Sequence, residues 1–194
     1  MVLLEIIKQI NWIDIFVVII LFRVGYISIK NGLPIVFFKL LGTIAAVYLS
    51  LHYYTNLTDF IRSFFKLDKG ASGILDFICL VVLATAAYLF FVLLRMFFYR
   101  FVKLAAVLNL DKWGGFVLGI VRAILMQSLI VYMLVVSGIG YLNNSVKNSF
   151  SGSSLIKIAP ETYIWLWNSI ASKFMAKEKF NNNVIDVVEN ITKK

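Results

Sequence analysis

The sequence contains few charged residues and almost none of the side chains that build disulfides or metal sites. Only 15% of its 194 residues are charged, and it has one cysteine, Cys79, and one histidine, His52. A single cysteine excludes an intramolecular disulfide and a cysteine-based metal cluster, and the lone histidine lacks the cysteine and carboxylate spacing of a zinc site. We therefore expect no cofactor and no metal, and we interpret Cys79 as a small buried apolar side chain.

Catalytic motifs are lacking as well. The sequence has no G-x-S-x-G, no H-E-x-x-H and no glycine-rich phosphate loop, and its apolar segments carry no paired carboxylates. Each of these patterns supplies a nucleophile, a metal-bound water or a phosphate cradle. We predict that the chain is not an enzyme.

The residues that are present are mostly apolar. They make up 61% of the chain, and the mean hydropathy is +0.88, whereas a globular domain is about half apolar and about a quarter charged. A soluble domain of this composition would expose an apolar surface that aggregates. The composition therefore predicts a membrane protein.

The net charge of +9 indicates which molecules the chain contacts. Basic residues near the ends of membrane spans attract anionic lipid head groups. The lysines and arginines are scattered among apolar segments, whereas a nucleic-acid-binding surface gathers them in one stripe. We expect a lipid bilayer with anionic head groups as the partner, and no nucleic acid.

Four apolar segments are long enough to cross about 30 Å of hydrocarbon, which takes about 20 helical residues. They are residues 12–29, 33–51, 74–94 and 114–136. Asn31 and Gly32 can end the first helix, and Pro34 can begin the second. The sequence predicts an all-α membrane protein whose residues 1–140 form a four-helix transmembrane bundle.

Amphipathic segments accompany the predicted spans. Residues 56–70 place apolar side chains at helical spacing, which is typical of a short helix lying on the membrane surface. Residues 141–194 begin as a Ser/Asn-rich linker and continue as an amphipathic helical tail. We expect Pro160 at the first position of the tail helix.

Two apolar stripes define the tail helices. The first stripe can pack either on the bundle or on lipid; it comprises Tyr163, Leu166, Trp167, Ile170 and Phe174. The second stripe predicts a last helix; it comprises Val184, Val187, Val188 and Ile191.

Three basic residues interrupt the predicted spans. If the helices alternate in direction, Arg23, Lys39 and Arg122 converge on one membrane face, where long side chains can reach the head groups. Arg122 admits a second interpretation, in which it points into the bundle and organises a polar cluster or a conduction path. Asp14 lies near the opposite face, so we expect no ion pair between Asp14 and Arg122.

Glycines open the fourth span. Gly115 and Gly119 are four residues apart, so they lie on one face of the helix and allow a neighbouring helix to approach closely. The alternative is a flexible hinge at Gly114 and Gly115. We expect the packing role to offset the weak helix propensity of glycine.

Two stretches carry a family resemblance. One is "NWIDIFVVIILFRVGYISIKNGLPIVFFKLLGTIAAVYLS", with a W-x-D start, an apolar span and a turn with glycine and basic residues. The other is "LNLDKWGGFVLGIVRAIL". Together they resemble the colicin V production protein (CvpA) family over about residues 10 to 140. The candidate structural or functional residues are Asp14, Arg23, Gly25, Lys39, Asp111, Gly115, Gly119 and Arg122.

The resemblance implies a multi-pass protein of the bacterial inner membrane that is accessory to toxin (colicin V) production or export and to envelope maintenance. Its partners would be a second copy of the chain or proteins of the envelope or the export machinery. The alternative is a small oligomeric channel or carrier subunit, with Lys39 and Arg122 lining a route for anions. Few polar residues inside the spans could line such a route; they are Thr43, Thr85, Gln127 and Ser128.

The distribution of positive charge predicts the orientation in the membrane. Lysine and arginine in short connections favour the cytoplasm, and slightly more of them flank the first and third connections than the opposite face. We therefore expect both termini outside the cytoplasm. A reporter fused after Lys194 should show alkaline phosphatase activity, and green fluorescence from the same junction would mean the reverse orientation.

Overall fold

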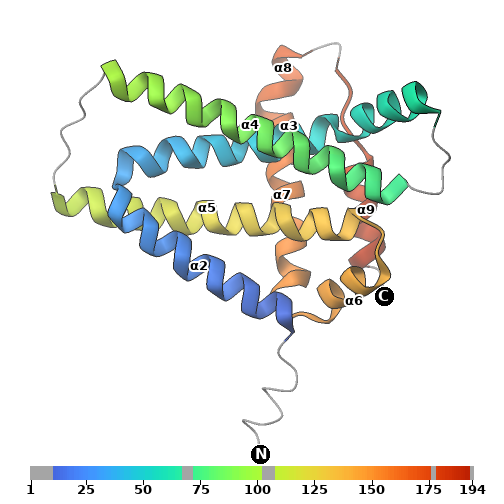
Figure 1. Ribbon diagram of the computed structural model, residues 1–194, viewed down its shortest axis with the longest axis horizontal. Coiled ribbons are helices and arrows are strands. Elements are labelled where there is room, and N and C mark those ends of the chain that lie inside the picture. The colour runs from blue at the N-terminus through green and yellow to red at the C-terminus, as the bar shows by residue number, and fades with distance from the viewer. Residues whose placement is uncertain (1–10, 67–71, 102–107, 176–177, 193–194) are drawn as a thin grey trace, which may run out of the picture.

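The computed structural model of the chain describes residues 11–66, 72–101, 108–175 and 178–192. These residues contain helices and no strand (Figure 1). The long helices are α2 (Trp12–Asn31), α3 (Leu33–Phe65), α4 (Ser72–Phe101) and α5 (Leu108–Val136). The tail contains α6 (Gly140–Asn148), α7 (Gly152–Leu166), the π-helical segment η2 (Trp167–Ala171), α8 (Ser172–Phe174) and α9 (Asn183–Thr192).

The four long helices contain the four predicted spans. Each helix is long and apolar enough to cross a membrane. The spanning ranges of α2, α3, α4 and α5 are Trp12–Asn31, Leu33–Phe65, Gly73–Phe97 and Asp111–Val136. The predicted all-α membrane fold is therefore confirmed. The helices run alongside one another, and α3, α4 and α5 enclose the larger apolar core (Figure 1).

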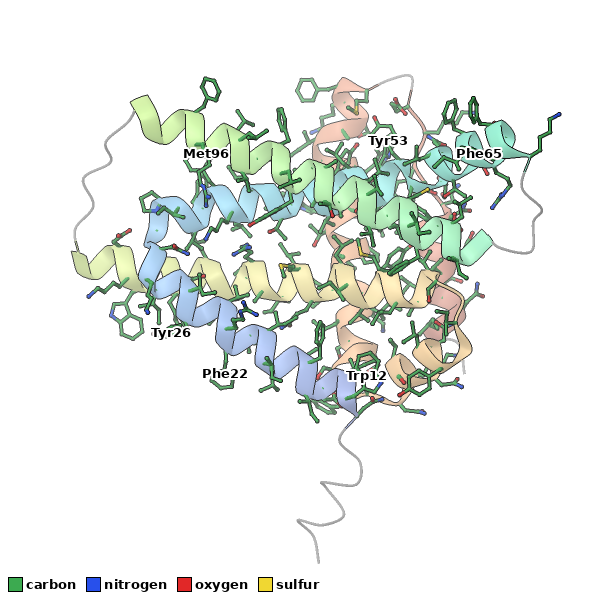
Figure 2. All side chains as sticks on the ribbon, in the orientation of Figure 1. Trp12, Phe22, Tyr26, Tyr53, Phe65 and Met96 are labelled. Carbon is green, nitrogen blue, oxygen red and sulfur yellow. The ribbon has the colours of Figure 1, made fainter. Side chains whose placement is uncertain are left out.

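Large apolar side chains cover the outside of the bundle. Phe22 and Tyr26 of α2 point away from the other helices (Figure 2), and Phe22 is 75% exposed. Met96 of α4 is 54% exposed. A protein with so large an apolar outer surface would aggregate in water. In a bilayer the same side chains contact lipid chains.

Helix α3 is longer than the sequence pattern suggested. It is one helix of 33 residues, about 50 Å at 1.5 Å per residue, so it exceeds the hydrocarbon thickness of about 30 Å. The predicted surface helix at residues 56–70 is its C-terminal part, and residues 67–71 lie outside the described residues. No glycine or proline interrupts the helix between Gly42 and its end at Lys66, which has a left-handed φ of 50°.

The start of α2 and the turn into α3 agree with the sequence pattern. Asn11 caps α2, and Asp14 completes a capping box with it. Helix α2 ends at Gly32, whose φ of 76° is a left-handed conformation that glycine adopts readily. Pro34 stands in the first turn of α3, where it loses no hydrogen bond.

The tail packs on the bundle. Helix α7 crosses α5 and α3 (Figure 1), and its Ile156, Ala159 and Tyr163 are buried. Of the first stripe, Tyr163 packs on the bundle, whereas Ile170 and Phe174 are 50% and 84% exposed, so the stripe docks only in part. The Ser/Asn-rich segment expected as a linker forms α6 and the first turn of α7. The last predicted helix is α9, whose Val184 is buried in the core.

The expectation that Pro160 begins the tail helix is wrong. Helix α7 begins at Gly152, and Pro160 lies inside it, where proline cannot donate to the helical ladder. Ser128 of α5 reaches the helix at this point: its hydroxyl donates to Leu155 O and accepts from Ala159 N at 2.6 Å. The hydroxyl thus stands between the two backbone groups of one helical turn and satisfies both.

We expect Ser128→Ala to destabilise the protein. The substitution removes two buried hydrogen bonds between α5 and α7 beside Pro160, and one such bond contributes about 0.5–1.5 kcal/mol. The Tm in detergent should fall. Ser63→Ala is the matched control, because Ser63 is exposed and bonds only Phe60 O in its own helix. Equal Tm values for the two variants would contradict the role of Ser128.

Candidate functional site

Asp111 joins the start of α5 to the turn between α2 and α3. Its Oδ1 accepts a hydrogen bond from Leu33 N at 2.5 Å. The carboxylate also lies against Gly32, where any Cβ would collide with it. Because α3 begins at Leu33, Asp111 places a negative charge at a helix N-terminus, worth about 0.3–1 kcal/mol.

Asp14 makes the corresponding connection at the opposite end of the bundle. Its carboxylate accepts hydrogen bonds from Ser151 N (2.8 Å), Ser151 Oγ (2.7 Å) and Phe150 N (3.3 Å). Next to it, Asn11 Nδ2 donates to Ser145 O. Asp14 therefore fixes the connection between α6 and α7 to the start of α2, and as expected it does not pair with Arg122.

The glycine face of α5 packs against α2. A Cβ on Gly115 would lie 2.9 Å from Ser28 O, and a Cβ on Gly119 would collide with the Ser28 side chain. From the other side, Gly25 faces the ring of Phe116. The predicted close helix contact is confirmed. Gly114 is also packed, against the side chain of Leu33, so the space around it is filled.

Two of the three converging cations meet inside the bundle. Lys39 of α3 interacts electrostatically with Arg122 of α5 and with Arg95 of α4. Arg122 Nη2 donates to the hydroxyl of Tyr88 at 3.0 Å. Its Nε is buried without a hydrogen-bond partner among the described residues. We call Lys39, Arg95 and Arg122 the cation cluster.

The position of Arg122 supports the second of its two interpretations. The side chain turns toward Tyr88 between the helices and organises a polar cluster. Arg23 does not join the cluster: it is exposed on α2, as expected for a side chain that reaches the head groups.

The cation cluster borders a narrow cleft between α3 and α4. The cleft is lined by Phe38, Lys39, Tyr88, Phe91 and Arg95, and it is too narrow to hold a water molecule. It gives no aqueous path through a single copy of the described chain.

A wider apolar groove lies beside the cleft. Its volume is about 350 Å³, and it runs between one face of α3, α4 and the helices η2 and α8. Leu41, Ala45 and Tyr48 line it from α3, and Ile170 and Phe174 line it from the tail. We call this space the tail groove.

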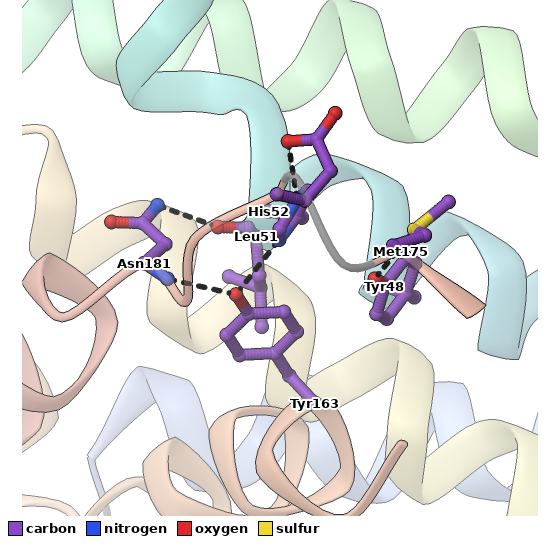
Figure 3. A network of polar contacts seen from close by, with 7 residues as sticks. Tyr48, Leu51, His52, Tyr163, Met175 and Asn181 are labelled. Atoms are coloured by element: carbon purple, nitrogen blue, oxygen red, sulfur yellow. Dashed lines mark hydrogen bonds and ion pairs between the residues drawn. The ribbon is translucent and has the colours of Figure 1, made fainter. Parts of the chain in front are cut away.

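A second polar network ties the tail to α3 (Figure 3). His52 is buried, and its Nδ1 lies 2.9 Å from the hydroxyl of Tyr163. Its Nε2 lies 3.5 Å from Glu178 Oε2, an ion-pair distance without hydrogen-bond geometry. Asn181 completes the network, with its N donating to the Tyr163 hydroxyl at 3.1 Å and its Nδ2 to Leu51 O at 2.8 Å.

The hydroxyl of Tyr163 is the centre of this network. Burial raises the pKa of the Tyr163 hydroxyl, which therefore stays protonated at neutral pH. Because that oxygen already accepts from Asn181 N, its own proton can go to Nδ1 of His52. Nε2 of the ring faces Glu178 Oε2. The imidazole ring of His52 also stacks on the rings of Tyr48 and Trp167, with centroid distances of 5.4 Å and 5.2 Å.

The family model for colicin V production protein matches residues 13–177. The chain belongs to this family. No curated protein and no solved structure matches it. The match begins in α2 and continues through the four long helices to the end of α8. The family unit therefore includes α6, α7, η2 and α8 as well as the bundle, while α9 lies beyond the match; the sequence resemblance reached only about residue 140.

Sequence reasoning identified Asp14, Asp111 and the glycines but missed other members of these sites. Arg95 was not among the candidate residues, although it lies seven residues after Tyr88 on the same face of α4. His52 was considered only as a possible metal ligand and was set aside. A lone histidine among aromatic residues, in "LHYYT", is a signal for a buried polar network.

We expect Gly119→Leu to disrupt the contact between α5 and α2. The new side chain would enter space that Ser28 occupies, and overpacking costs about 1–3 kcal/mol. The Tm of the protein in detergent should fall and assembly should be impaired. Gly140→Leu is the control, because a Cβ there meets no atom within 4 Å. If Gly119→Leu leaves the Tm unchanged, the glycine face is not a tight helix contact.

Proposed function

We propose that this chain is an accessory protein of the bacterial inner membrane that supports production or export of a colicin V-type peptide toxin and maintenance of the envelope. The observation that carries this proposal is the family match over residues 13–177. The four apolar helices support a multi-pass location. The chain would act by binding partners, either a second copy of itself or proteins of the export machinery.

The way the tail is held supports a binding role. Asp14, Ser128 and His52 come from three different long helices, and each contacts the tail. A tail fixed at three points presents one defined surface. A partner protein can recognise such a surface without paying for the ordering of a mobile segment.

A small oligomeric channel or carrier subunit is the second candidate. The cation cluster inside the bundle favours it, since Lys39 and Arg122 would attract anions. The polar side chains of the spans weigh against it, because three of them bond to backbone: Thr43 to Lys39 O, Gln127 to Val17 O and Ser128 to α7.

A toxin-release assay tests the first candidate. In a strain that makes a colicin V-type toxin, deletion of this chain should lower the toxin in the medium and raise it in the cells. The wild type and Asp59→Ala should restore release, because Asp59 is exposed and bonds only Arg62. Asp14→Ala should restore less toxin release than the wild type, because it removes the hydrogen bonds that hold the connection between α6 and α7. Inhibition zones measure the active toxin in the medium, and immunoblots measure the toxin in cells and in medium.

The same assay can contradict the proposal. Unchanged release after deletion would exclude a role in toxin export. The channel candidate is tested separately with purified protein in liposomes. Anion flux that Lys39→Gln and Arg122→Gln abolish would favour the channel over the accessory role.

A further inference from the structure

The cation cluster carries positive charge that the protein does not neutralise. Lys39 and Arg95 are partly exposed, and Lys39 also feels the charge of Arg122. Within the described residues, no carboxylate lies at ion-pair distance from Lys39, Arg95 or Arg122. Like charges held together near lipid are unfavourable unless an anion joins them.

Nearby carboxylates are not available to supply that anion. Asp111 accepts from Leu33 N at the start of α3, and Asp14 holds the connection between α6 and α7 at the other end of the bundle. The cleft between Lys39 and Arg95 is too narrow for water. An anion can therefore bind at the mouth of the cleft, where Lys39 and Arg95 reach the surface.

The cluster is continuous with the tail groove. Phe91 of α4 lines both the cleft and the groove. On α3, Phe38 lines the cleft, and Leu41, Ala45 and Tyr48 follow it at helical spacing along the groove. One surface thus leads from three cations to an apolar trough of about 350 Å³.

The shape of the groove suits a hydrocarbon chain. Its walls are aliphatic or aromatic, and its polar hydroxyl, that of Tyr48, donates to Met175 Sδ at 3.7 Å. The Tyr48 and Met175 side chains lie side by side (Figure 3), and Tyr48 is the lining residue of α3 farthest along the helix from Lys39. Phe174 at the rim is 84% exposed, so the groove opens to the surroundings of the bundle.

We propose that the cation cluster and the tail groove together bind one anionic phospholipid. The phosphate lies at Lys39 and Arg95, and an acyl chain lies in the groove along α3. An anion joined to a long apolar chain matches both parts of the surface, and the bilayer supplies such a molecule. The lipid bridges α3 and α4 to the tail helices η2 and α8. The proposal does not depend on a role in toxin release.

Native mass spectrometry of the full-length protein in mild detergent tests the proposal. The protein is titrated with phosphatidylglycerol and with phosphatidylethanolamine that carry the same acyl chains. Wild-type protein should retain one phosphatidylglycerol at concentrations where phosphatidylethanolamine dissociates. This comparison requires no variant, so a folding defect cannot obscure it.

Two pairs of variants test the two parts of the site. Lys39→Gln with Arg95→Gln should weaken phosphatidylglycerol binding roughly thirtyfold, since each cation near the lipid surface contributes about fivefold. Arg23→Gln with Lys112→Gln is the matched control, because both side chains are exposed cations outside the cluster. Ala45→Trp should fill the groove and weaken binding, whereas Ala86→Trp on the exposed face of α4 should not.

Three results would overturn the proposal. Equal retention of the two lipids would exclude recognition of the anionic head group. Unchanged binding in both the cluster variant and Ala45→Trp would place the lipid elsewhere. Displacement of phosphatidylglycerol by inorganic phosphate alone would show that the cluster is a site for small anions.

Discussion

Hydrogen bonds from polar side chains to distant backbone groups hold the helices of this chain in their arrangement. Ser128 completes a turn of α7 beside Pro160, and Asp111 accepts from the first amide of α3. Asp14 accepts from two amides between α6 and α7, and Gln127 Nε2 donates to Val17 O at 2.7 Å. Each bond joins segments far apart in the sequence, so satisfying the backbone also fixes how the helices are arranged.

This use of carboxylates leaves the charges of the bundle unbalanced. Asp14 and Asp111 stand at opposite ends of the long helices and are already engaged with backbone amides. The cations Lys39, Arg95 and Arg122 are left with a tyrosine hydroxyl and aromatic rings. Charge that the protein does not neutralise must find its counterion in the surroundings, and for a membrane protein these are the lipid head groups and the ions beside them.

The long apolar segments and the close glycine contact were predictable because each depends on residues in one stretch of chain. Hydropathy located the four spans, and the spacing of Gly115 and Gly119 predicted a packed face. Hydropathy located only the apolar part of α3, which ends near residue 51. The helix continues beyond that part because nothing between Gly42 and Lys66 breaks it. Pro160 was misjudged, and Arg95 was missed as a candidate, because their surroundings come from other helices. The partner that makes a buried proline tolerable, Ser128, is 32 residues away along the chain.

The triple attachment of the tail has a consequence for the order of assembly. Its anchors lie on α2, α3 and α5, and the tail leaves the ribosome after all of them. Contacts of such large sequence separation form only once the separate helices have come together. Docking of α7 therefore marks a bundle whose insertion is complete. A chain that has inserted only some of its helices lacks an anchor and displays an unattached amphipathic tail, which chaperones and membrane proteases can recognise.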